Sequence, residues 1–312
     1  MSATPSRLGA SRVAIFTDDP GWHGAQLKRA LAERGCAGEY VSLTACRFDL
    51  SGDGAPIRIP GFGDFLPDGA FVRGVPGGSL EEVVFYLDIL HALQELGLTV
   101  YNDARAIERT VDKGMTSFLL RRSGIPTPPT WVTRDPEEAR AIILRELRDG
   151  QQMVSKPLFG SQGEGLQRLQ RVEDLTELMS SNGVYYLQRF VDCGDQPFHD
   201  WRVFVIAGRA VAAMRRNGQT WLNNVAQGAR CEAAKLDAPW RELAEDAVRV
   251  VGMGYAGVDI IRDAGGALSV IEVNSVPAWK GLQSVTEARV AELLAEDFLT
   301  RCGYPATREK AA

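Results

Sequence analysis

Residues 257–281, GVDIIRDAGGALSVIEVNSVPAWKG, decide the fold of this chain. Two runs rich in apolar and β-branched residues, 255–262 and 268–274, stand on either side of the turn Asp-Ala-Gly-Gly at 263–266. Runs of this composition are typical of strands, and Asp and Gly tolerate the positive φ angles of tight turns. We therefore predict a β-hairpin.

The polar residues of this hairpin form a pattern of oxygen ligands. Because side chains alternate along a strand, Glu272 and Asn274 are expected on one face, with Ile271 and Val273 on the other. If Asp259 on the first strand shares the face of Glu272, two carboxylates and an amide oxygen converge, and this donor set suits Mg²⁺. A solvated hairpin face is the alternative interpretation, and the rest of the chain decides between the two.

The composition is that of an ordinary globular protein, with 312 residues of which 45% are hydrophobic and 24% charged. A net charge of −5 gives no support for a nucleic-acid partner, so an anionic ligand must be held by local basic groups. No apolar run reaches the length of a membrane span, and the first residues lack the apolar core of a secretory signal. The five scattered cysteines have no CxxC spacing and favour reduced thiols, so we expect a cytoplasmic protein.

Strand and helix patterns divide the chain into three parts. They alternate through residues 1–103, which predicts an N-terminal parallel α/β domain with ligands near the carboxyl ends of its strands. An α+β lobe follows at 104–190, and strands dominate a larger lobe at 191–312. A dinucleotide-binding enzyme is excluded, because Thr-Asp-Asp-Pro-Gly follows the first strand where a GxGxxG motif would stand.

A glycine-rich loop, GSQGEG at 160–165, comes shortly after the strand predicted at 152–156. The backbone N–H groups of such a loop can bind phosphate oxygens, and Lys156 at the strand end adds a point charge. The lysine precedes the glycines, so the motif is not a Walker A loop. A flexible hairpin loop is the alternative interpretation.

Two further segments carry groups that suit a nucleotide. The apolar strand predicted at 185–191 can offer backbone N–H and C=O groups to a purine, with a merely buried strand as the alternative. Asp200 and Arg202 share one face of the next strand, Arg216 ends its partner, and Asn224 follows closely. Surface charge is the alternative for each residue alone, but together they supply the cations and amides that a triphosphate requires.

The order of these motifs resembles the ATP-grasp superfamily, and most closely its RimK-like α-L-glutamate ligases. The signatures are D-x-R at Asp200 and Arg202, G-V-D ending at Asp259, and E-V-N from Glu272 to Asn274. The resemblance covers about residues 104–281. It implies an ATP-grasp fold of the α/β and α+β class, in which two α+β lobes clamp ATP beside the N-terminal parallel α/β domain.

The resemblance also implies roles for individual residues. The catalytic residues would be Arg216, Arg202 and Lys156, and two Mg²⁺ ions, or Mn²⁺, would be held by Asp259, Glu272 and Asn274. The residues expected to bind ATP are Lys113, Lys156, Ser161, Gln162, Gly163, Gln188, Arg189, Phe190, Val191, Asp200 and Asn224. Arg189-Phe190 replace the Glu-Tyr pair that family members often have in the adenine hinge. Asn223 replaces a serine of the ribosomal-protein branch, which argues against such a substrate.

Residues 73–81 and 274–283 resemble the branch that acts on one-carbon coenzymes of the tetrahydromethanopterin and methanofuran type. This resemblance implies a ligase that activates a carboxylate as an acyl phosphate and joins it to an amino acid, with L-glutamate expected. Arg73 and Lys280 can bind carboxylates and Trp279 can stack on a pterin-like ring; an exposed loop arginine and a packing tryptophan are the alternatives.

The partners follow from the same resemblance. We expect a small-molecule carboxylate, an amino acid and a homo-oligomer, with neither nucleic acid nor membrane. Two other functions stay open, namely a ligase acting on a protein or peptide C-terminus and a catalytically inactive nucleotide-binding module. The complete set Asp259, Glu272 and Asn274 argues against the inactive module, which could dispense with metal ligands.

Overall fold

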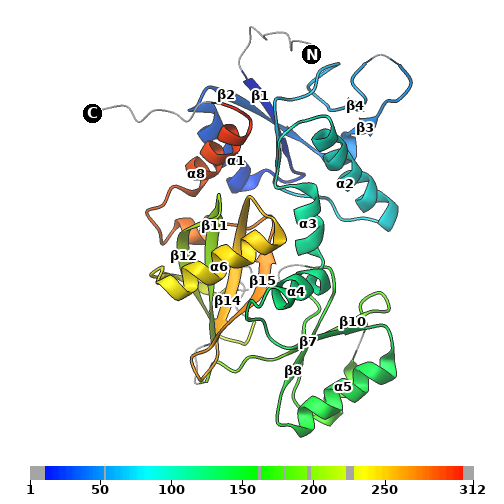
Figure 1. The fold of residues 1–312 in the computed structure, drawn as a ribbon, viewed down its shortest axis with the longest axis vertical. Helices are drawn as coiled ribbons and strands as arrows, with labels where there is room; N and C mark the ends of the chain where they lie inside the picture. The colour runs from blue at the N-terminus through cyan, green and yellow to red at the C-terminus, as the bar shows by residue number, and fades with distance from the viewer. Residues whose placement is uncertain are drawn as a thin grey trace. The chain divides into compact units, whose positions relative to one another are not determined.

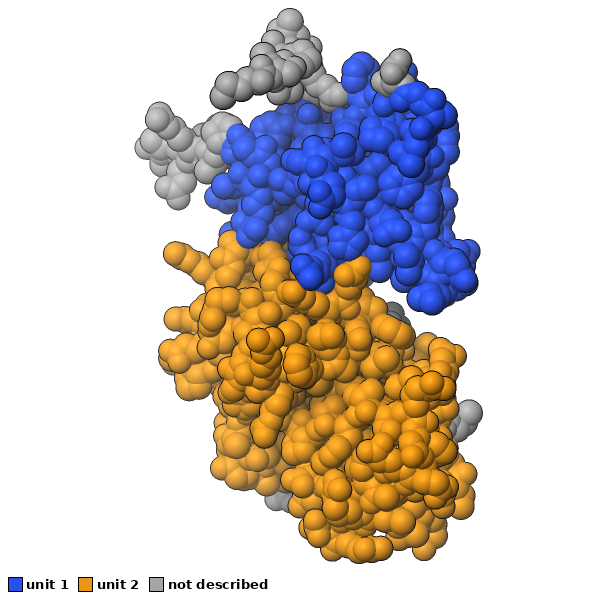
Figure 2. Space-filling view, turned by 45° about the vertical axis from the view of Figure 1, so that its right-hand side comes forward, with its two compact units in different colours: residues 1–105, 278–280, 289–312 blue, residues 106–277, 281–288 orange. Residues whose placement is uncertain are grey.

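The computed structural model describes residues 11–52, 54–160, 163–178, 180–194, 198–222 and 228–304. The chain divides into two compact units, coloured separately in Figure 2. Unit 1 comprises residues 1–105, 278–280 and 289–312, and unit 2 comprises residues 106–277 and 281–288. The C-terminal segment, which the sequence grouped with the large lobe, therefore belongs to unit 1.

A parallel four-stranded sheet forms the centre of unit 1 (Figure 1). Its strands lie in the order β2 (Cys36–Val41), β1 (Ser11–Phe16), β5 (Ala70–Val72) and β6 (Val100–Tyr101). The chain leaves β1 toward β2 on one side and comes back as β5 on the other. Parallel α/β sheets bind ligands at the carboxyl ends of two strands that part in this way.

Helices cover both faces of this sheet. The helix α1 (Gly21–Ala32) packs against α8 (Val290–Arg301) on one face, and α2 (Leu80–Glu95) lies on the other (Figure 1). A capping box begins α2, because the Ser79 hydroxyl accepts from the Glu82 N–H while the Glu82 carboxylate accepts from the Ser79 N–H. The remaining elements of unit 1 are η1 (Leu43–Ala45), β3 (Arg47–Phe48) and β4 (Ile57–Arg58).

The first sheet of unit 2 is antiparallel. Its strands lie in the order β7 (Thr130–Thr133), β10 (Tyr185–Arg189), β8 (Met153–Lys156) and β9 (Gln167–Leu169), covered by α5 (Pro136–Arg148). The apolar side of α5 closes a small core with the sheet, made of Ala139, Ile142, Ile143, Met153, Leu169, Leu175 and Leu187. A 3₁₀ helix, η2 (Val172–Glu177), follows β9 in this part of the unit.

The second sheet of unit 2 has five antiparallel strands. They lie in the order β13 (Arg230–Ala233), β12 (Arg209–Gly218), β11 (Phe198–Ile206), β14 (Tyr255–Arg262) and β15 (Leu268–Asn274). Helix α6 (Ala238–Val251) crosses one face, as Figure 1 shows, and buries Ala244, Ala247 and Val248 there. The short helices of the chain are α3 (Ala104–Val111), α4 (Lys113–Arg122) and α7 (Lys280–Gln283). A parallel sheet in one unit and antiparallel sheets in the other confirm the predicted fold class.

The predicted hairpin of β14 and β15 is confirmed, with one irregularity. Asp259 lies opposite Glu272, whereas Ile260 lies opposite Val270, so Ile271 is an extra residue in a β-bulge. The strict alternation expected along this strand is therefore wrong at Ile271. The bulge lets Val270 enter the core while Glu272 keeps its place opposite Asp259.

Among the helices of the described residues, none is both long and apolar enough to cross a bilayer.

Candidate active site

One face of the large sheet of unit 2 gathers charged side chains from four strands. Arg202 on β11, Asp259 on β14 and Glu272 on β15 lie directly opposite one another, and this row crosses three strands. Asp200 is two residues before Arg202, so it shares that face, and it lies opposite Arg216 on β12. The sheet register thus brings together residues that are as far apart as 72 positions in the sequence.

These side chains form a buried network of ion pairs. Arg202 donates from Nε and Nη2 to the two carboxylate oxygens of Asp259 at 2.7 and 2.6 Å. Arg216 makes the same two-pronged contact with Asp200 at 2.7 and 2.6 Å, and its Nη2 also lies 3.1 Å from Asp259. Asp200, Arg216 and Asp259 are only 5, 4 and 3% exposed. Such bidentate, charge-assisted bonds fix the orientation of both guanidinium groups.

The network sets the charge of each member. Burial opposes ionisation of Asp259, but Arg202 and Arg216 outweigh it and hold the pKa of that carboxyl below its usual value. Burial raises the pKa of Asp200 to about 6, against the pull of Arg216. Burial also works against the charge of Arg216, yet Asp259 and Asp200 prevail and raise its pKa. Both arginines are therefore permanent cations at this face.

Each guanidinium keeps hydrogen-bond donors beyond this network. Arginine has five N–H groups; Arg202 and Arg216 use Nε and Nη2 on carboxylates, and within the described residues no contact occupies Nη1 of either side chain. Asp200 was expected to bind the nucleotide. Its two oxygens instead hold Arg216, so in this structure Asp200 positions the arginine.

The expected metal ligands supply hard oxygen donors in this row. In the described part of the chain Glu272 accepts no hydrogen bond and makes no ion pair, so its carboxylate is available. The Asn274 amide nitrogen donates to Gly257 O and to Asp259 at 3.4 Å each, which leaves its Oδ1 as the free end of the amide. Among the described residues, no group of three or more His, Cys, Asp or Glu side chains is arranged so that these alone could hold a metal ion. The donors are the Glu272 carboxylate, the Asn274 amide oxygen and the Asp259 carboxylate, which also pairs with two arginines. This set fits Mg²⁺, because Mg²⁺ binds few protein ligands and keeps several waters.

Lys156 lies at the end of β8 in a second polar network. Its Nζ donates to Gln188 Oε1 at 2.7 Å, and the Gln188 amide donates to Thr130 Oγ1 and to the Tyr186 hydroxyl at 3.0 and 3.1 Å. Tyr186 in turn shares a hydrogen bond of 2.8 Å with Ser117. Burial lowers the pKa of Lys156 to about 8, with Glu272 raising it and Lys113 lowering it further. Glu272 and Asp259 of the large sheet thus act electrostatically on this amine.

Lys113 is the first residue of α4, and the Asp112 carboxylate caps this helix by accepting from the Gly114 and Met115 N–H groups. The Nζ of Lys113 donates to Gly160 O at 2.7 Å, and this bond ties the helix start to the glycine-rich loop. Burial lowers the pKa of Lys113, while Glu272 raises it. The cations around Glu272 are Lys113, Lys156, Arg202 and Arg216, against the carboxylates Asp200, Asp259 and Glu272. Asp112, which also acts on Lys113, adds a fourth carboxylate, so cations and carboxylates are equal in number here.

The predicted adenine hinge is only partly open. The Arg189 N–H donates to Pro129 O and the Phe190 N–H to Gln152 O, so neither amide is available to a purine here. The Arg189 side chain donates to Glu146 at 2.6 Å. The hinge can thus act through its carbonyl groups and through Val191, and not through the amides of Arg189 and Phe190.

Three expected substrate residues belong to unit 1. The Arg73 guanidinium lies over the Trp279 ring at 4.6 Å, and Lys280 directly follows that tryptophan. Trp279 is fully buried, so its ring packs inside the unit, and the expected stacking on a ligand ring has no open face in this structure. Lys280 is exposed.

The remaining expected residues concern the glycine-rich loop and the loop after β12. Ser161, Gln162 and Asn224 lie outside the described residues. Gly163 is described and has φ of 77°, a left-handed conformation that favours glycine.

Sequence reasoning missed the residues that support the functional side chains. They are Ser117, Thr130, Glu146 and Tyr186 of unit 2 and His23 of unit 1. The signal that could have found some of them is a polar residue in a buried strand, such as Gln188, which is 2% exposed and needs partners.

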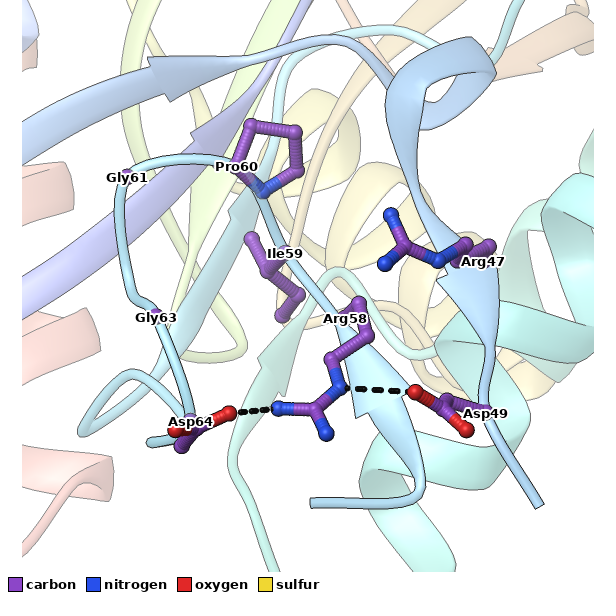
Figure 3. A pocket seen from close by; sticks show the side chains of 8 residues that line it. All are labelled: Arg47, Asp49, Arg58, Ile59, Pro60, Gly61, Gly63 and Asp64. Atoms are coloured by element: carbon purple, nitrogen blue, oxygen red, sulfur yellow. Dashed lines mark hydrogen bonds and ion pairs between the residues drawn. The ribbon is translucent and has the colours of Figure 1, made fainter. Parts of the chain in front are cut away.

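An open pocket of about 500 Å³ lies in unit 1 beside β3 and β4 (Figure 3). Arg58 lies between Asp49 and Asp64 there, donating to Asp49 at 3.2 Å and pairing with Asp64. Its cation is thereby neutralised, and none of the residues expected to function lines this pocket.

Comparison with known proteins identifies the fold family. Residues 110–297 match the model of the RimK-like ATP-grasp domain. The chain belongs to the RimK-like ATP-grasp family. It is 35% identical over 84% of its length to the tetrahydromethanopterin:alpha-L-glutamate ligase of Methanocaldococcus jannaschii, covering 89% of that protein. The corresponding ligase of Methanococcus maripaludis is 34% identical over 74% of this chain and 78% of its own length.

Solved structures share the fold of this chain. The ATP-grasp ligase PsnB, solved with its minimal precursor, Mg and ADP, superposes with a TM-score of 0.72 at 22% identity over 96% of this chain and 100% of its own. The D-cycloserine synthetase DcsG superposes with a TM-score of 0.69 at 18% identity over 94% of this chain and 100% of its own. These likenesses confirm the predicted ATP-grasp fold.

Proposed function

We propose that the protein is an ATP-dependent carboxylate–amine ligase that joins L-glutamate to a coenzyme carboxylate of the tetrahydromethanopterin type. The observation that carries the proposal is the row Arg202, Asp259 and Glu272 beside Lys156, a site with permanent cations for phosphates and a free carboxylate for a hard cation. The ligase names of its relatives in two methanogens support the substrate class.

The reaction has two steps. A carboxylate oxygen of the acceptor attacks the γ-phosphorus of ATP, the bond from that phosphorus to the β,γ-bridging oxygen breaks, and an acyl phosphate and ADP form. The glutamate amine then attacks the acyl carbon, inorganic phosphate leaves with the C–O electron pair, and the amine loses a proton. Neither step needs a nucleophile from the protein.

The side chains supply position and charge, which dominate the catalysis of phosphoryl transfer. The free N–H groups of Arg216 and Arg202 bind oxygens of the transferring phosphoryl group, while Asp200 and Asp259 keep the two guanidinium groups in place. Lys156 and Lys113 bind phosphate oxygens of ATP, with Gln188 orienting Lys156. The adenine lies against the carbonyl groups of residues 189–190 and the backbone of Val191.

Glu272, Asn274 and Asp259 are the residues that would hold Mg²⁺, with Mn²⁺ as a substitute. The cation supplies positive charge to the phosphate oxygens. The guanidinium groups of Arg202 and Arg216 contact the Asp259 carboxylate in this structure. Asp259 could therefore bind a metal ion only if some of these contacts were broken. Titration of Mg²⁺ in the presence of ADP counts the ions, for which two are expected.

The proposal is tested by ADP release and by the product mass. The protein is incubated with ATP, Mg²⁺, L-glutamate and tetrahydromethanopterin, and the acceptor should gain the mass of a glutamyl residue. Glu272→Gln and Lys156→Ala should each abolish ADP release without unfolding the chain. The matched controls Glu242→Gln and Lys235→Ala change exposed residues of the same unit and should retain full turnover.

Full ligase turnover by both Glu272→Gln and Lys156→Ala would contradict the proposal. If ADP is released with a peptide that has a free C-terminal carboxylate, and not with the coenzyme, the acceptor is a peptide. Binding of ATP without ADP release under any acceptor would instead favour an inactive nucleotide-binding module.

A further inference from the structure

The carboxyl ends of β1 and β5 lie side by side in the parallel sheet of unit 1. Arg73 directly follows β5, and its N–H donates to Phe16 O at the end of β1 at 2.8 Å. The two neighbouring strands part here, since β1 is followed by α1 on its way to β2 and β5 by α2 on its way to β6. Because parallel sheets bind ligands where their strand order reverses, the side chains at this edge are candidates for substrate contacts.

His23 lies in the first turn of α1 at this edge. Its Nε2 accepts hydrogen bonds from the backbone N–H groups of Trp279 and Lys280, at 3.1 and 3.2 Å. An acceptor at Nε2 requires a neutral imidazole with its proton on Nδ1. Burial lowers the pKa of His23 to about 4, helped by Arg73 and Lys280 and opposed by Asp19, so the ring stays neutral above that pH.

Trp279 makes this edge rigid. Its fully buried ring lies edge-on to His23 at 4.7 Å and to Trp22 at 6.4 Å between centroids. The Arg73 guanidinium lies over the same ring at 4.6 Å. A guanidinium stacked on an indole loses little freedom when it binds a carboxylate, because its plane is already fixed.

The charges at this edge favour an anion. Arg73 and Lys280 both act on the imidazole of His23, and Asp19 is the carboxylate that opposes them. Two cations at the ends of different segments, one of them planar and already stacked, suit a carboxylate group.

We propose that His23 is a positioning residue that fixes the backbone of Trp279 and Lys280, so that Arg73 and Lys280 together bind a substrate carboxylate. The inference rests on the proposed ligase function, in which L-glutamate and the acceptor both carry carboxylates. His23 itself touches neither substrate and acts through the segment 278–280.

The test compares variants that keep or remove the acceptor atom. His23→Leu removes it, whereas the Oε1 atom in His23→Gln reaches the position of Nε2. The KM values of ATP, L-glutamate and tetrahydromethanopterin are measured for each, with His91→Leu in α2 as the matched control. Loss of two backbone hydrogen bonds should raise the KM of one carboxylate substrate about tenfold in His23→Leu. That substrate is the one whose carboxylate binds here, and Arg73→Leu should raise the same KM.

A positioning role requires the conservative variant to rescue the site. His23→Gln should return that KM to within about threefold of the parent value, and the KM of ATP should stay within about twofold in every variant. Equal KM values for His23→Leu and His23→Gln would overturn the inference, as would an equal rise in the KM of ATP. If His23→Leu does not fold, His23→Asn replaces it, because its shorter side chain leaves the acceptor out of reach.

A binding measurement separates this inference from the ligase function. Calorimetric titration of L-glutamate and of tetrahydromethanopterin compares the parent with His23→Gln and His23→Leu. Weaker binding of one ligand to His23→Leu alone supports the inference even if the parent chain shows no ligase turnover. Ligase turnover with carboxylate binding that is independent of His23 overturns the inference and leaves the ligase function intact. Absence of binding to the parent also overturns it.

Discussion

The guanidinium of Arg202 lies directly across the sheet from the carboxylate of Asp259 and donates to both of its oxygens. Gly257, two residues before Asp259, makes room for Pro277. A Cβ at Gly257 would lie 2.9 Å from Pro277 Cβ and 3.5 Å from Cδ and Nε of Arg202. A methyl group at this position would therefore collide with Pro277, whereas its distance from Arg202 would be an ordinary van der Waals contact. The glycine of the G-V-D signature thus has a packing reason.

Removing Arg202 should destabilise the protein. Arg202→Met leaves Asp259 buried with Arg216 as its remaining cation, and losing one partner of a buried pair costs about 3 kcal/mol. Urea unfolding measures the loss. Lys235→Met is the control, because its ion pair with Asp237 is 88 and 54% exposed, and it should cost less than about 1 kcal/mol. Asp259→Asn should lower the free energy of unfolding less in the Arg202→Met chain than in the parent. Equal losses in the two chains would contradict an energetic coupling between Arg202 and Asp259.

Adding one methyl group to β14 should disturb the site. Gly257→Ala forces Pro277 to shift, so we expect a loss of about 1–3 kcal/mol in the free energy of unfolding, together with reduced ADP release. The control is Gly52→Ala, because a Cβ at Gly52 meets nothing within 4 Å. Unfolding curves and ADP assays of the two variants check the expectation. A Gly257→Ala chain as stable and active as the control would show that the close approach is unimportant.

The affinity for ATP should depend on pH through Lys156. A pKa of about 8 means that the amine is charged below that pH and loses its charge as the pH rises through it. The KM of ATP should therefore rise above pH 8 in the parent chain. Lys156→Arg keeps its charge to a pH above about 12 and should remove this dependence. Steady-state measurement of the KM of ATP between pH 6 and 10, about two units on either side of the pKa, tests this expectation. If Lys156→Arg shows the same pH profile as the parent, Lys156 is not the source of the pH dependence.

Gln188 should control the orientation of Lys156. Gln188→Leu removes the acceptor of Lys156 and leaves the Tyr186 and Thr130 hydroxyls without the amide, so the KM of ATP should rise about tenfold. Gln188→Glu places a carboxylate beside the amine and should move the rise of KM to higher pH, because it stabilises the charged lysine. The exposed Gln170→Leu serves as the control. Identical kinetics of Gln188→Leu and the control would refute the role.

The local part of the fold could be predicted from the sequence. The hairpin at 255–274 depends on residues close together in the chain, so residue composition and turn chemistry were sufficient to predict it. The order of the polar motifs indicated the ATP-grasp family, because each motif is short and local. The bulge at Ile271 escaped prediction, since an extra residue in a strand leaves no periodic signal.

The sequence by itself determined which residue types the protein has for phosphate and metal chemistry, and the order in which they follow the strands. Only the tertiary structure decided how they are paired. The sheet register set Asp259 against Arg202 and Asp200 against Arg216, which turned an expected nucleotide ligand into a support for an arginine. It also buried Trp279 beneath Arg73 and joined His23 to a segment 256 residues away. Such pairings depend on contacts between segments far apart in the sequence. The local pattern of residues does not predict them, because it reports only on neighbours along the chain.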